Sequence, residues 1–153
     1  LYYTKENYLL NDGEYGNFKR YNKDDGLKML LPFDDAATVR LGSKWHTPTR
    51  ADFLELHENC TMVVSEVEGH RGISFVSKKN GNYIFFRTTG HRHDGKWYGS
   101  STHVRFWIAN TSNRSGYDAD YITLIIKEDN TIEVYPYDKC YRYYGMPIRP
   151  VRD

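Results

Sequence analysis

The sequence predicts a single α+β domain over residues 1–153, with two short helices followed by a twisted, mostly antiparallel β assembly. Two observations support this fold class. Two helix-capping patterns precede position 60, and beyond it apolar and polar residues alternate in short runs that end at turn residues. Helices and strands do not alternate along the chain, so a doubly wound nucleotide-binding sheet is not expected. The length is typical of one domain, and neither a repeat nor a linker divides it.

The first helix follows a segment without a clear period. Residues 1–33 are rich in Tyr, Asn, Asp, Lys and Gly, which predicts irregular structure around short extended pieces. A helix is then expected over 34–41, because Asp34 or Asp35 can act as the N-cap and Gly42 can end the helix.

The second helix carries the stronger signal. Thr49 can cap it, and Asp52 stands three residues later, which is the spacing of a capping box. Phe53 and Leu56 contribute to a partial apolar face. These features predict a helix over 50–58.

The remaining residues are typical of short strands joined by turns. Residues 79–82, K-N-G-N, and 128–130, E-D-N, predict hairpin turns. Residues 88–101, which include three glycines, and the polar residues 110–118 are expected to form loops. The expected strands cover 61–67, 72–77, 83–87, 104–109, 121–127 and 131–135, and a last strand within 140–153 is interrupted at Gly145.

Charge and hydropathy exclude two classes of partner. Lys and Arg number 21 and Asp and Glu 20, and no basic stripe occurs, so no nucleic-acid partner is expected. The mean hydropathy is −0.74. No apolar stretch approaches the roughly 20 residues of a membrane helix, so this segment is not expected to insert into a membrane.

The two cysteines, Cys60 and Cys140, leave two interpretations open. They could form one disulfide that closes a long loop, or they could be two free buried thiols. Their separation does not match the CxxC spacing of a metal or redox site.

A histidine pair is the nearest approach to a metal motif. In G-H-R-H-D-G, His91 and His93 would share one side of a strand, and Asp94 or His103 could supply a third ligand. The cationic Arg92 and the flanking glycines favour a solvated loop instead, so neither a metal nor another cofactor is predicted. The sequence contains no nucleophile elbow, P-loop or dinucleotide motif, so we expect a non-enzymatic protein.

Aromatic residues supply the main functional signal. The chain has 14 Tyr, 7 Phe and 3 Trp. Tyr and Trp are enriched in paratopes, and aromatic residues in general also favour β-rich cores. Binding residues concentrate in loops on a rigid scaffold. The expected core residues are Trp45, Pro48, Phe53, Leu56, Trp107, Ile108 and Ile148. The candidate ligand-binding residues are His91, His93, Trp97, Tyr98, His103, Tyr117, Tyr141 and Tyr143.

The order of several short motifs resembles the FISUMP (major paralogous) domain family of Bacteroides-type surface proteins. The shared landmarks are Asp35-Ala36-Ala37, Trp45, Pro48-Thr49, Phe53, Leu56, Asn59-Cys60-Thr61, N-G-N-x-I-F-F at 80–86, F-W-I-A-N-T at 106–111, and Y-R-Y-Y-G-M-P-I-R-P-V-R at 141–152. They cover residues from about 34 to 153. The chain departs from the family pattern at His46, Ile108 and Ala109.

The resemblance implies a C-type-lectin-like fold and export to the cell surface, often on a lipoprotein or a fimbria-associated chain. It also implies binding or adhesion, with a carbohydrate or a protein as the ligand. The E-P-N, Q-P-D and W-N-D motifs of calcium-dependent lectins are absent from the sequence. Two alternatives stay open: a structural or assembly domain of a surface appendage, and a hydrolase that uses carboxylates.

Overall fold

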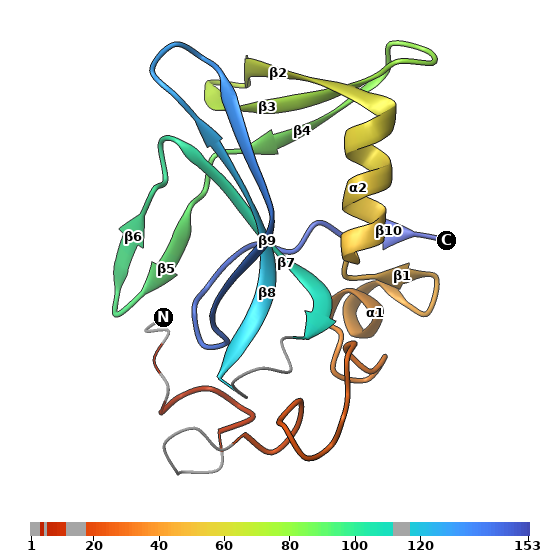
Figure 1. Cartoon of the computed structure of the whole chain (residues 1–153), viewed down its shortest axis with the longest axis vertical. Helices are drawn as coiled ribbons and strands as arrows, with labels where there is room; N and C mark the ends of the chain where they lie inside the picture. Colours follow the sequence, from red (N-terminus) through yellow and green to blue (C-terminus); the bar gives the residue numbers. More distant parts are fainter. Residues whose placement is uncertain (1–3, 5, 12–17, 112–116) are drawn as a thin grey trace.

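The computed structural model describes residues 4, 6–11, 18–111 and 117–153 (Figure 1). It contains two short helices and ten strands, and every strand pair in this part of the chain is antiparallel. The predicted α+β class is therefore confirmed in its coarse form, as a mostly antiparallel β structure with two helices. Figure 1 shows one three-stranded sheet across the top of the molecule, a second running down its middle, and α2 beside them.

Helix α1, Ala36–Leu41, begins two residues later than expected. Asp35 is the N-cap, because its backbone is extended and its carboxylate accepts a hydrogen bond from the N–H of Ala37. Asp34 has another role, since it accepts two hydrogen bonds from Arg20. Gly42, at a φ of 98°, ends the helix as predicted by donating its N–H to the carbonyl of Thr38.

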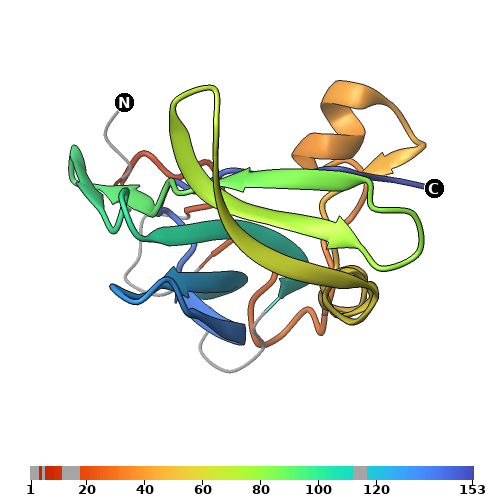
Figure 2. The ribbon, with the colours of Figure 1, turned by 90° about the horizontal axis from the view of Figure 1, so that it is seen from above.

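Helix α2, Arg50–Asn59, confirms the predicted capping box. The hydroxyl of Thr49 accepts from the N–H of Asp52, and Asp52 Oδ2 accepts from the N–H of Thr49. Asn110 Oδ1 accepts from the N–H of Arg50 and so satisfies another free donor of the first turn. Phe53 is the buried residue of the helix and faces both sheets. Figure 2 shows α2 nearly end-on beside the sheets.

The first sheet is a meander of β2 (Cys60–Val67), β3 (His70–Ser77) and β4 (Tyr83–Arg87). Its strands match the predicted ones closely, although β3 starts two residues earlier than expected. Gly72 allows the closest approach in this sheet, because a Cβ there would lie 2.2 Å from the carbonyl oxygen of Phe86.

The second sheet consists of β7 (His103–Thr111), β8 (Asp118–Ile126) and β9 (Ile132–Tyr141). Other backbone segments bond to the outer edge of β7, since Trp107 donates to Pro147 O and Ala109 donates to Pro48 O. Pro136 lies at the irregularity of the outer strand β9, and its carbonyl accepts from Arg50 Nε at 3.3 Å. A proline and a bonded carbonyl both disfavour addition of a further strand to β9.

The hydrophobic core lies between the two sheets and α2. Phe53, Phe75, Phe86 and Phe106 form a chain of ring contacts with centroid distances of 5.1 to 6.4 Å. Among the expected core residues, Pro48, Phe53 and Ile108 are buried. The others are half-buried, namely Trp45, Leu56, Trp107 and Ile148.

Two pairs of short strands complete the fold. Strand β1 (Trp45–His46) pairs with β10 (Val151–Arg152), which fixes the C-terminal segment beside α1 and α2. The expected loop 88–101 is wrong in part, because β5 (His91–His93) and β6 (Lys96–Tyr98) form a hairpin there. Its turn residues, Asp94 and Gly95, both have positive φ, as a tight Asp-Gly hairpin requires.

Candidate functional site

The hairpin β5–β6 sorts the predicted binding residues onto two faces. His91 lies opposite Tyr98 in the register, and Arg92 lies opposite Trp97. Because side chains alternate along a strand, His91, His93 and Tyr98 share one face, and Arg92 and Trp97 share the other. The two histidines therefore share one side of a strand, and the solvated loop that the sequence favoured here is wrong.

The rings of His91, His93, Tyr98 and Tyr144 form a stack on the first face. Tyr98 and Tyr144 each lie 4.4 Å from the His93 ring, centroid to centroid, and 5.2 and 5.0 Å from the His91 ring. The interplanar angles of these four contacts are 14° or less. The imidazole faces are therefore used in packing.

Two further predicted residues join this stack, one from the end of β9 and one from the segment that follows it. Tyr141 and Tyr143 stack on each other at 5.2 Å and meet Tyr144 edge-on at 5.7 and 5.4 Å. Five of the eight predicted binding residues thus form one aromatic cluster with Tyr144. Sequence reasoning missed Tyr144, although the Y-R-Y-Y run was a signal for it, because no strand period applies in the turn that contains it.

Backbone hydrogen bonds hold the hairpin to the same segment. Arg92 donates its N–H to Gly145 O at 2.8 Å, and Gly145 returns its N–H to Arg92 O at 2.7 Å. The aromatic cluster and this bridge therefore join two segments that are about 50 residues apart in the sequence. The arrangement gives the opposite face of the hairpin a fixed support.

The environment of His91 favours the neutral imidazole. Burial first, and the charge of Arg105 second, lower the pKa of His91 to about 4. The Arg105 guanidinium donates a hydrogen bond to His91 Nδ1, which a ring protonated at that nitrogen could not accept. His91 is therefore a poor candidate for a cation at neutral pH.

The other three predicted residues lie elsewhere. Trp97 is on the outer face of the hairpin, where its side chain is 58% exposed and the Arg92 guanidinium lies 5.6 Å from its ring. His103 Nδ1 is 2.8 Å from the hydroxyl of Thr102. Tyr117 packs edge-on against Phe18 at 6.4 Å.

The thiols and possible metal ligands offer little chemistry in the described part of the chain. Cys60 and Cys140 are both free thiols, so the disulfide is wrong, and both residues are half-buried rather than buried. Burial raises the pKa of Cys140, so its thiol is not activated as a nucleophile. Within the described ranges, no group of three or more His, Cys, Asp and Glu side chains is placed to hold a metal ion.

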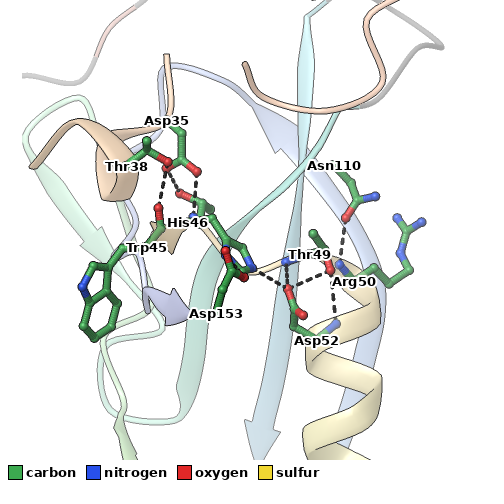
Figure 3. A network of polar contacts seen from close by, with 10 residues as sticks. Asp35, Thr38, Trp45, His46, Thr49, Arg50, Asp52, Asn110 and Asp153 are labelled. Carbon is green, nitrogen blue, oxygen red and sulfur yellow. Dashed lines mark hydrogen bonds and ion pairs between the residues drawn. The ribbon is translucent and has the colours of Figure 1, made fainter. Parts of the chain in front are cut away.

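A polar network lies on the other side of the molecule, where α2 meets the C-terminal segment. His46 Nε2 is 3.1 Å from Asp52 Oδ2, and His46 Nδ1 is 3.4 Å from Asp153 Oδ1 (Figure 3). Burial raises the pKa of Asp52, but hydrogen bonds from Thr49 and His46 lower it more, so the net shift is downward.

A groove of about 740 Å³ adjoins this network, between α2, β4 and the C-terminal segment. Its floor includes the buried rings of Phe53, Phe86 and Phe106, and the Arg149 guanidinium lies 4.8 Å from the Phe86 ring. Carboxylates and guanidinium groups both line the groove, so its charge favours neither sign of ligand.

Comparison of the chain with protein-family models, with curated proteins and with solved structures found no match. Among the helices that the structure describes, neither has the length and apolar character needed to cross a bilayer.

Proposed function

We propose that this domain is a non-enzymatic binding or adhesion module outside the cytoplasm that recognises a carbohydrate or protein ligand through its aromatic hairpin. One observation carries the proposal: Trp97 is a large, exposed aromatic side chain on a two-stranded hairpin that a ring stack holds in place. An exposed indole can stack on the apolar face of a sugar or anchor a protein loop.

The neighbours of Trp97 suit this role. Arg92, on the same face, offers hydrogen-bond donors, and Tyr98 and Tyr141 remain 38% and 40% exposed at the border of the cluster. Because the hairpin is already ordered, a ligand would not have to supply the free energy of ordering it. The outer face of β5–β6 is therefore the proposed contact surface.

The same proposal includes a fold family and a cellular location for the domain. The motifs that resemble the FISUMP family support a C-type-lectin-like fold and a place at the cell surface, as part of a lipoprotein or a fimbria-associated chain. Several of these motif positions have defined structural roles here. Thr49 caps α2, and Gly145 bonds to the hairpin.

Glycan-array binding of the purified domain tests the proposal, with Trp97→Ala as the variant. Tyr135→Ala is a matched control, because Tyr135 is also an exposed aromatic side chain but lies on β9. We expect saturable binding that Trp97→Ala weakens by about tenfold or more and that Tyr135→Ala leaves unchanged.

The same array with EDTA asks whether a cation takes part, and we expect no effect. If no glycan binds, a broad screen of surface proteins with the same two variants follows. A domain that binds neither class, or that binds equally well without Trp97, would contradict the proposal.

An open sheet edge favours a second candidate, assembly with another copy of the domain. Ser77 N bonds to Asn82 O, and Thr88 N bonds to Arg71 O, which fixes the direction of the backbone groups in β4. By alternation, the N–H and C=O groups of Tyr83, Phe85 and Arg87 point away from β3. In the described part of the chain these groups have no backbone partner.

A twofold pairing of two β4 strands would use all these groups at once. Centred on Phe85, it would place Arg87 of one copy opposite Tyr83 of the other, a favourable cation–π arrangement. Tyr83→Pro removes an outward N–H without removing a bond to β3. Light scattering should show a concentration-dependent dimer that Tyr83→Pro abolishes. Glu66→Pro, on the outer edge of β2, should leave the dimer intact.

A further inference from the structure

A second cavity, of about 440 Å³, lies between α1, the N-terminal segment and the ends of β7 and β8. Its volume is within the range of small-molecule sites, which are mostly apolar with a few placed polar groups. It shares no lining residue with the aromatic hairpin or with the groove beside α2.

Apolar side chains line this cavity and also rim it. Trp107, Ile108 and Ile148 contribute from the body of the domain. Leu9, Phe33 and Val39 also line the cavity although they are 86%, 63% and 63% exposed. Clustered exposed apolar side chains of this kind mark binding surfaces more often than single ones do.

The polar side chains of the lining differ in whether their hydrogen-bonding groups already have partners. Asp34 already accepts from Arg20 and from the hydroxyl of Tyr21. Asn110 Oδ1 accepts from Arg50 N, which leaves its amide N–H groups unused by any described residue. The guanidinium of Arg40 also has no partner in the described ranges. The unused groups of Asn110 and Arg40 are therefore hydrogen-bond donors.

The charges of the lining lead to the same conclusion. Asp34 is 2.7 Å from Arg20, which lies beside the lining. Burial lowers the pKa of Arg142, and the charges of Tyr8, Asp25 and Asp118 raise it. Arg142 donates to three backbone carbonyls, including Arg20 O and Asp118 O. Arg40, which is exposed at the rim, forms no such ion pair with any described residue.

We propose that this cavity binds a small amphipathic carboxylate, with its apolar chain or ring inside and its carboxylate at Arg40 and Asn110. A carboxylate supplies hydrogen-bond acceptors for the unused donors and a negative charge for the Arg40 guanidinium. The apolar body replaces water against Leu9, Phe33 and Val39. This site is separate from the proposed contact surface of the hairpin.

Calorimetric titration of the full chain with dodecanoate, dodecanol and dodecyltrimethylammonium, all as monomers in solution, tests the proposal. We expect saturable binding of dodecanoate, at least about tenfold weaker binding of the alcohol, and no binding of the cation. Arg40→Gln should weaken dodecanoate binding by about tenfold and leave the binding of dodecanol unchanged. Positions 39 and 40 are both exposed, so we expect substitutions there to preserve the fold.

Val39→Asp should abolish the binding of both dodecanoate and dodecanol, and Val63→Asp on β2 serves as the matched control. Equal binding of all three amphiphiles, or dodecanoate binding that survives Val39→Asp, would overturn the proposal. Trp97→Ala should leave dodecanoate binding intact, which separates failure of this site from failure of the hairpin site.

Discussion

Asp35 and Thr47 form a buried pair in which one carboxylate accepts both donors of its partner. Asp35 Oδ2 accepts from the N–H of Thr47 at 2.8 Å, and Asp35 Oδ1 accepts from its hydroxyl at 2.6 Å. Thr47 is fully buried and Asp35 is only 4% exposed. Since Asp35 also caps α1, one side chain joins the start of this helix to the segment that leads into α2 (Figure 3).

We predict that Asp35→Asn lowers the free energy of unfolding by about 2–3 kcal/mol, because the amide replaces one acceptor oxygen with a donor. Burial raises the pKa of Asp35, but hydrogen bonds from Thr47 and Ala37 lower it more, so the folded pKa lies below the ordinary value of 3.8. The stabilisation is therefore present above pH 3.8 and is lost as pH falls through the folded pKa.

Urea unfolding at pH 7 and near pH 3 measures both effects. The parent chain should lose more stability between these two pH values than the Asp35→Asn variant. Equal losses would show that the ionisation of Asp35 does not contribute to stability.

Gly72→Ala should destabilise the domain by about 3 kcal/mol or more. The new methyl carbon would lie 2.2 Å from Phe86 O and 2.6 Å from the Phe85 ring, so β3 and β4 must separate. Gly81→Ala is the contrasting variant, because its surroundings are open and only its φ of 74° opposes a side chain, at a cost of about 1–2 kcal/mol. Thermal unfolding of the two variants should rank them in this order, and the reverse order would contradict the described packing.

The imidazole of His91 should titrate near pH 4 in an NMR experiment, well below the ordinary value of 6.5. Burial is the main cause and the charge of Arg105 the second, so Arg105→Gln should raise the pKa of His91. Between pH 6.5 and about 4 the unfolded chain binds a proton here and the folded chain does not. The free energy of unfolding therefore decreases as the pH is lowered through this window. Titration of His91 near 6.5 would contradict the stack.

Arg50→Lys should reduce stability by about 1–2 kcal/mol although the charge is kept. Arg50 bonds Asp120 Oδ2 at 2.8 Å, donates to Pro136 O, and lies 4.4 Å from the ring of Tyr137. A lysine ammonium cannot make this planar set of contacts. Urea midpoints of the variant and of Arg40→Lys, on the exposed side of α1, give the comparison; equal midpoints would contradict this role of Arg50.

The sequence predicted those features that depend on neighbouring residues. The capping box of Thr49 and Asp52 and the end of α1 at Gly42 need only local hydrogen bonds, so a short motif is sufficient to identify them. The hairpin at 91–98 was missed because its strands have three residues each and lack β-branched side chains. The pair Asp94-Gly95 was the available signal for it.

The candidate site was predictable in composition but not in arrangement. Residue types identified the aromatic cluster, yet only the register of β5 and β6 separates Trp97 from His91 and Tyr98. The carboxylate cavity depends on side chains from α1, β7 and the N-terminal segment, which come together through long-range packing. No local pattern encodes such a juxtaposition.

The contacts of Arg142 have a consequence for how the chain acquires its structure during synthesis. Its guanidinium bonds to Arg20 O and Tyr21 O, which precede it by 122 and 121 residues. A ribosome must therefore release almost the whole domain before the early segment can dock, and contacts this distant in sequence are typical of slow folding. During that interval the early tyrosines and leucines stay open to chaperones and proteases.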